Sequence, residues 1–222
     1  MNGKPWPILL LALTHVLPAQ DVVVTPLRPT DRPPSELLRP PTDAQSSTAP
    51  IDWANLPPWR QTSFYGLRAP GTFFVFVVDA SGSMADPGRW LRLQQELHRT
   101  LARLQFPQRY LVIFFNDQAW PMPGRVPASA SRDSIHRTLA WARRFQPQGA
   151  TDPRAALAMA LSFKPDAIFL LSDGEFPDGV ANDLIQAHPN PRPIHCIDLS
   201  GNTSGDDLRR IAAHSGGRYS TP

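Results

Sequence analysis

The pattern of apolar and polar positions separates an irregular N-terminal part of the chain from a regular C-terminal part. Beyond residue 71, continuous apolar runs without polar alternation predict strands covered on both faces. These runs are residues 73–78, 110–115, 167–171 and 194–199, and a final short strand is expected at 218–220. Residues 120–126 contain Pro121 and Pro123, so they can only form an edge strand or irregular structure.

Helical periodicity fills the segments between these runs. Residues 90–106 place leucines at helical spacing on one face, which predicts an amphipathic helix. Residues 132–145 and 154–163 predict two more, the first capped by Ser131 and the second preceded by the Asp152 cap and by Pro153 as its first residue. Short helices are expected at 180–187 and 206–214. The alternation predicts an α/β fold, a doubly wound and mostly parallel sheet with helices on both faces.

The first 71 residues lack this regularity. Residues 1–19 combine Lys4, a short apolar run and Ala19 at a cleavage-type position, which indicates a secretory signal peptide. The apolar run of about ten residues is too short to cross a bilayer, which needs about twenty. Residues 20–71 are rich in Pro, Thr and Ser and predict a linker or stalk. We therefore expect an exported protein without a transmembrane span when mature, located in the periplasm, on the cell surface or in the medium.

The end of this linker carries several aromatic residues. They flank Pro57-Pro58 and are Trp53, Trp59, Phe64 and Tyr65. We expect them to form a strap packed on the surface of a folded domain spanning residues 72–222. The alternative is an aromatic patch that binds a ligand.

Charge and cysteine content exclude other functions. The net charge is +3, but the basic residues are scattered and form no stripe, which excludes specific nucleic-acid binding. The single cysteine, Cys196, cannot form an internal disulfide and lies in an apolar run, where a buried thiol is expected. Its neighbour His195 would point to the opposite face of the strand, so a Cys–His nucleophile is not expected.

One loop carries candidate metal chemistry. Asp79-Ala80-Ser81-Gly82-Ser83 follows the first buried strand, at the carboxyl end where ligands bind in such sheets. Hydroxyl and carboxylate oxygens suit hard cations such as Mg2+. By itself the motif could also be a capped turn leading into a helix.

Two further loops are expected at the same sheet edge, and they change this interpretation. They read Gly149-Ala150-Thr151-Asp152 and Leu171-Ser172-Asp173-Gly174-Glu175. The three loops in this order resemble a von Willebrand factor type A domain with its metal-ion-dependent adhesion site. The resemblance covers residues 72–222.

The resemblance implies a specific metal site. Ser81 and Ser83 would ligate the ion directly, Thr151 directly or through water, and Asp79 and Asp173 mostly through bridging waters. The ion would be Mg2+ or Mn2+, with Ca2+ as a further candidate, and a Glu or Asp of a protein partner would complete its coordination. Two departures are Ala150, where many members have glycine, and a sequence that stops at Pro222, where many members continue into a helix that responds to metal. Long-range switching through that helix is therefore not expected.

Other acidic residues are weaker candidates. Asp152 is explained by its capping role and Asp117 by a turn, while Glu175 and Asp178 are expected in a solvated loop, although they could tune the mouth of the site. The six histidines lack the spacing of a zinc site.

The most consistent function is a binding module that is not an enzyme. A metal-dependent hydrolase with an aspartyl nucleophile needs an acidic residue two positions after that aspartate, and here the position is Ser81. No Gly-x-Ser-x-Gly elbow is present to make a serine the nucleophile. The remaining alternative is an accessory subunit of an ATP-driven chelatase or remodelling complex, because some such subunits resemble this domain.

Overall fold

The apolar runs lie side by side in one sheet in the computed structural model, which describes residues 51–174, 176–201 and 206–222. Its parallel strands are, in spatial order, β4 (Arg109–Phe115), β3 (Phe73–Asp79), β7 (Ala167–Ser172), β8 (Ile194–Asp198) and β9 (Tyr219–Ser220). Two short strands, β5 (Ala119–Pro121) and β6 (Ala128–Ser129), pair antiparallel with β4. The mostly parallel sheet and the edge position of the proline-containing strand are confirmed.

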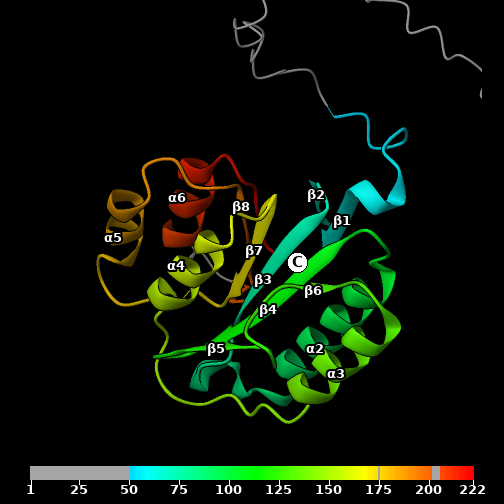
Figure 1. The fold of residues 1–222 in the computed structure, drawn as a ribbon. Helices are drawn as coiled ribbons and strands as arrows, with labels where there is room; N and C mark the ends of the chain where they lie inside the picture. The colour runs from blue at the N-terminus through cyan, green and yellow to red at the C-terminus, as the bar shows by residue number, and fades with distance from the viewer. Residues whose placement is uncertain (1–50, 175, 202–205) are drawn as a thin grey trace, which may run out of the picture. The chain divides into compact units, whose positions relative to one another are not determined.

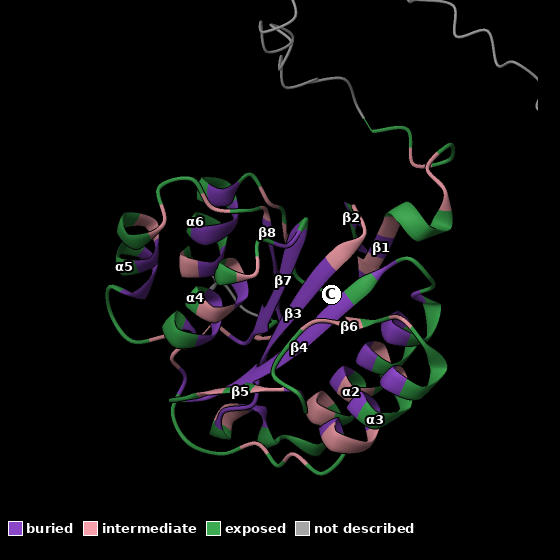
Figure 2. Ribbon diagram, in the orientation of Figure 1, coloured by how far each residue is buried: buried purple, intermediate pink, exposed green. Residues whose placement is uncertain are grey.

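Helices cover both faces of this sheet. Figure 1 shows α2 (Pro87–Arg103) and α3 (Arg132–Ala142) on one side, and α4 (Arg154–Ser162), α5 (Val180–Ala187) and α6 (Asp206–Ser215) on the other. Figure 2 shows buried residues concentrated in the strands and on the inner faces of these helices. The doubly wound α/β fold is therefore confirmed.

The first helix differs from its predicted bounds. It begins at Pro87 instead of residue 90, because the Asp86 side chain accepts a hydrogen bond from the Arg89 amide (2.8 Å) and caps it. It ends at Arg103 instead of residue 106, since Leu104 is extended. Pro107 also disfavours helical geometry at the residue before it.

Residues 51–71 do not behave as a linker. Strands β1 (Gln61–Phe64) and β2 (Leu67–Pro70) form an antiparallel hairpin, and the compact unit of the fold starts at Ile51. The turn has positive φ at Tyr65 (46°) and Gly66 (77°), which matches the twist of a tight hairpin. The domain boundary expected at residue 72 is thus placed too late. The expected signal peptide at 1–19 and the linker up to residue 50 lie outside the described residues.

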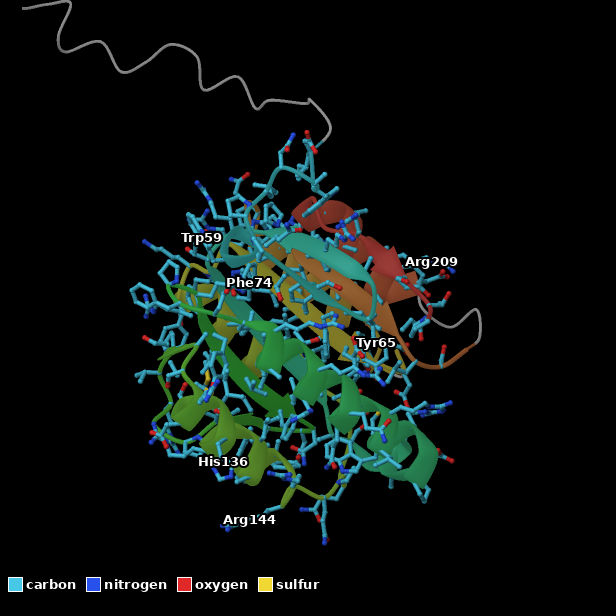
Figure 3. All side chains as sticks on the ribbon, turned by 90° about the vertical axis from the view of Figure 1, so that its right-hand side faces the viewer. Trp59, Tyr65, Phe74, His136, Arg144 and Arg209 are labelled. Carbon is cyan, nitrogen blue, oxygen red and sulfur yellow. The ribbon has the colours of Figure 1, made fainter. Side chains whose placement is uncertain are left out.

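The hairpin packs on the sheet beside α2. Phe64 is fully buried, with its ring 5.3 Å from that of Phe76 in β3 and 5.9 Å from that of Phe169 in β7. Thr100 of α2 donates a hydrogen bond from its hydroxyl to the Ser63 carbonyl (3.1 Å). Figure 3 views this side of the molecule, with Tyr65 and Trp59 labelled. The expected strap is confirmed for Phe64 and Tyr65, whereas Trp59 stays 38% exposed.

A buried histidine next to Phe169 makes stability depend on pH. His195 of β8 is 5% exposed and accepts a hydrogen bond at Nδ1 from the Arg218 amide (3.1 Å). Burial, with a smaller contribution from the charge of Arg218, lowers the pKa of His195 to about 4. Below pH 6.5 the unfolded chain therefore binds a proton that the folded chain does not, and stability falls as pH falls.

We expect this histidine to account for a loss of about 2 kcal/mol of unfolding free energy between pH 7.5 and pH 5. Urea unfolding of the parent and of His195→Asn at both pH values measures it, because Asn can still accept the Arg218 amide hydrogen bond. Other groups titrate alike in both proteins, so the quantity to compare is the unfolding free energy of the parent minus that of His195→Asn. If this difference is the same at both pH values, the prediction is contradicted.

Candidate functional site

Three loops meet at the carboxyl ends of β3, β4 and β7, where the strand order reverses. Strand β3 runs into the short 3-10 helix η2 (Gly82–Ala85), and the segment 148–152 lies directly against it. Two backbone hydrogen bonds join them, from the Gly82 amide to the Gly149 carbonyl (2.9 Å) and from the Gln148 amide to the Ala80 carbonyl (2.9 Å). A Cβ atom at residue 82 would stand 3.3 Å from the Gly149 oxygen, so glycine permits this close approach.

Asp79 is the buried centre of the site. Its side chain is inaccessible to solvent; Oδ1 accepts a hydrogen bond from the Ser81 amide (2.8 Å) and Oδ2 accepts one from the Ser172 hydroxyl (2.5 Å). Burial raises the pKa of Asp79 to about 6, although these hydrogen bonds act in the opposite direction. None of the described residues forms an ion pair with it. Its negative charge is therefore poorly compensated by the protein alone.

Hydroxyl residues lie in the loops at this end of the sheet. The Ser81 and Ser83 Oγ atoms lie 3.1 Å apart, with Ser81 buried and Ser83 partly exposed. Thr151 is also buried, and within the described part of the chain its hydroxyl makes no hydrogen bond. The structure thus brings the three hydroxyl residues singled out from the sequence to one end of the sheet.

Asp173 supplies the second carboxylate. It is 2% exposed; Oδ2 accepts a hydrogen bond from Arg89 Nη1 (2.9 Å), while Oδ1 is buried with no hydrogen-bond partner among the described residues. A buried acceptor without a partner is costly by about 1–3 kcal/mol, more when it is charged. This oxygen therefore needs a hydrogen-bond donor or a cation, and the described residues provide neither.

Arg89 is a site residue that sequence reasoning missed. It lies in the first turn of α2, and Nη1 donates to the Ser83 carbonyl (3.0 Å) as well as to Asp173. In the sequence it lies one residue before the helix predicted at 90–106, where nothing distinguishes it from an ordinary solvated arginine. When Arg89 is counted together with the carboxylates of Asp79 and Asp173, the formal charge of the site is −1.

Asn116 is the second residue that was missed. It lies directly after β4. Its side-chain Nδ2 donates to the Gln148 backbone carbonyl (3.0 Å), and its backbone carbonyl accepts a hydrogen bond from the Asp152 amide (2.7 Å). It therefore holds both ends of the Thr151 loop. Its place directly after a buried strand is the signal in the sequence, whereas the neighbouring Asp117, the candidate named there, is exposed.

The weaker acidic candidates that the structure describes do not join the cluster. Asp152 accepts from the Arg154 amide (3.0 Å) and from its guanidinium (2.7 Å), and these contacts lower its pKa. The predicted cap is wrong, because α4 begins at Arg154 with Pro153 at the cap position and no side-chain cap hydrogen bond, while Asp152 lies one residue earlier. Asp178 is exposed, and Glu175 lies outside the described residues.

The chemistry of the site is that of oxygen ligands. In the described residues, no group of three or more His, Cys, Asp or Glu is arranged to hold a metal. Burial raises the pKa of the Cys196 thiol far above its usual value, so the thiol stays protonated. The three hydroxyls, the unpartnered Asp173 oxygen and the net negative charge fit a hard divalent cation.

Comparison with known proteins gives a family and a fold. The family model described as von Willebrand factor type A domain matches residues 74–221. A structure titled von Willebrand factor type A from Catenulispora acidiphila is similar, with a TM-score of 0.61 and 20% identity over 70% of this chain and 40% of that one. An aerotolerance-related membrane protein from Bacteroides fragilis matches with a TM-score of 0.54 and 17% identity over 68% of this chain and 92% of that one.

A third similar structure comes from an extracellular material. Proximal thread matrix protein 1 from the mussel byssus, described with a zinc-occupied MIDAS motif, has a TM-score of 0.51 and 21% identity over 69% of this chain and 42% of that one. This chain therefore spans less than half of the Catenulispora and mussel proteins. At sequence identities of 17–21%, these structural similarities establish the fold alone. The search of curated proteins found no match.

Proposed function

We propose a function for this chain, which belongs to the von Willebrand factor type A domain family. It is a binding module without catalytic activity, and it holds a protein partner through a divalent cation. Domains of this family are in general protein-interaction modules, and some carry a metal in a metal-ion-dependent adhesion site. The observation that carries the proposal is the buried, unpartnered Oδ1 of Asp173, whose other oxygen binds an arginine that also contacts the carbonyl of Ser83.

The residues have distinct roles in this proposal. Ser81, Ser83 and Thr151 hold the ion through their hydroxyl oxygens. Asp79 and Asp173 balance its charge and orient the bound waters and the serines. Mg2+ or Mn2+ suits these oxygen ligands, Ca2+ is a further candidate, and the mussel relative shows that a domain of this fold can carry zinc. A cation held mostly by neutral hydroxyls attracts an anion, so a Glu or Asp carboxylate of the partner completes its coordination.

The same features weigh against enzymatic alternatives. Ser81 occupies the position where an aspartyl-nucleophile hydrolase needs an acid, and the hydroxyls of Ser81 and Ser83 hydrogen-bond each other instead of a histidine. An accessory role in an ATP-driven chelatase or remodelling complex would require a cytoplasmic protein. The signal-like residues 1–19 favour export instead. Among the described residues, no helix is long and apolar enough to cross a membrane.

Calorimetry with Mn2+ on the full chain tests the proposal. We expect the parent to bind Mn2+, and then to bind a short peptide with a central Glu but not the same peptide with Gln. Ser83→Ala should weaken Mn2+ binding about tenfold or more, because it removes one direct ligand. Ser129→Ala on β6, an exposed serine, is the matched control and should bind as the parent does. A parent that binds no divalent cation would refute the proposed function.

A further inference from the structure

Arg89 places a fixed positive charge inside the proposed metal site. Its side chain is 26% exposed, and the ion pair with Asp173 Oδ2 (2.9 Å) joins residues 84 positions apart in sequence. The second hydrogen bond, from the same Nη1 to the Ser83 carbonyl, fixes the guanidinium beside the hydroxyl pair. Arg89 thus contacts two of the three loops that form the site.

The remaining donors of this guanidinium are unused. Within the described residues, Nε and Nη2 of Arg89 make no hydrogen bond. Arginine presents its donors in a planar fork that matches the two oxygens of a carboxylate. Because the side chain is 26% exposed and contacts two loops of the site, these donors can serve a ligand that binds there.

Charge counting gives the direction of the effect. Asp79 and Asp173 contribute −2 and Arg89 contributes +1, so the site has a formal charge of −1 before a divalent cation enters and +1 afterwards. Without Arg89 these values would be −2 and 0. Arg89 therefore opposes entry of the metal and strengthens the attraction of the loaded site for an anion.

We propose that Arg89 is a second anchor for the acidic group of the ligand, which the loaded site holds between the metal and the guanidinium. This inference rests on the proposed function and sharpens it, because it makes the ligand a carboxylate with both oxygens engaged. A carbonyl or hydroxyl ligand, which could complete the coordination of a metal, would gain little from the guanidinium.

The test measures Mn2+ binding and Glu-peptide binding separately in Arg89→Gln. We expect Mn2+ to bind about tenfold more tightly and the Glu peptide, at saturating Mn2+, to bind about tenfold more weakly, by loss of one charge-assisted contact. Arg89→Lys keeps the charge but not the fork, so its Mn2+ affinity should match the parent and its peptide affinity should fall between the two. Arg92→Gln, an exposed arginine one turn further along α2, controls for net charge and should change neither quantity appreciably.

The outcomes separate this inference from the proposed function. If the parent fails to bind Mn2+, the proposed function fails and the inference fails with it. If the parent binds both and Arg89→Gln binds the peptide as tightly as the parent, the function stands and the second anchor is overturned. Thermal melting shows whether Arg89→Gln folds. If it does not, Arg89→Lys decides, and unchanged peptide binding in that variant overturns the bidentate anchor.

Discussion

Asp79→Asn is expected to weaken Mn2+ binding by about 100-fold while stabilising the metal-free protein. Asp79 is completely buried, forms no ion pair with any described residue and has a pKa raised to about 6. Keeping it ionised at neutral pH costs the folded state up to about 3 kcal/mol relative to the unfolded chain. Asparagine removes this charge at nearly constant shape. Its carbonyl can accept the Ser81 amide hydrogen bond, and the Ser172 hydroxyl can turn to accept from its amide.

The measurement is urea unfolding with and without metal. In chelator at pH 7.5, Asp79→Asn should unfold at higher urea than the parent, whereas with Mn2+ at 100 times the dissociation constant the parent should gain about 2.7 kcal/mol and the variant almost nothing. Asp133→Asn, an exposed position on α3, is the control and should respond to Mn2+ as the parent does. Equal stabilisation of parent and Asp79→Asn by Mn2+ would remove Asp79 from the metal site.

The sign of the pH dependence follows from the same burial. Since the folded-state pKa of Asp79 lies above its unfolded value of 3.8, the folded chain binds the extra proton between pH 4 and 6. The cost of the buried charge is fully present above pH 6 and disappears as pH falls towards 4. In chelator, the difference in unfolding free energy between Asp79→Asn and the parent should therefore shrink as the pH falls from 6 towards 4. His195 acts in the opposite direction over this range, but it is common to both proteins.

The central sheet could be predicted because its strands carry strong local signals. Uninterrupted apolar runs in β3, β4 and β7 reflect burial on both faces, and alternating helices leave only the doubly wound arrangement. The rule that carboxyl ends of parallel strands gather at one edge then placed the Asp79 and Asp173 loops together. The Thr151 loop follows no strand directly, and it was expected at this edge because it lies just before a predicted helix.

Features that depend on contacts between distant residues could not be predicted. Arg89 belongs to the site through its contacts with Asp173 and the Ser83 carbonyl, whereas the sequence shows only a polar residue just before the predicted helix. Asn116 acts through backbone groups of residues 148 and 152, which no local motif encodes. The hairpin was missed because each strand has four residues, too few to show alternation within a proline-rich segment.

Phe64→Ala is expected to cost about 3–5 kcal/mol of unfolding free energy, the usual range for a large aromatic removed from a core. The ring is fully buried and makes edge contacts with Tyr65, Phe76 and Phe169 at 5.1–5.9 Å between centroids. Alanine would leave a cavity between the hairpin and the sheet. Urea unfolding measures the loss. Trp59→Ala, which truncates a partly exposed aromatic of the same segment, should cost far less.

Truncation separates a structural hairpin from a detachable strap. Removing residues 1–50 should leave the stability unchanged, because the compact unit starts at Ile51. Removing residues 1–71 should expose the face of Phe76 and Phe169 to water and destabilise the domain at least as much as Phe64→Ala does. Equal unfolding free energies of the two truncated chains would show that packing of the hairpin on the sheet contributes no net stability. Because β3 carries Phe76 in its middle and Asp79 at its end, loss of the hairpin should also lower the fraction of chains able to bind metal.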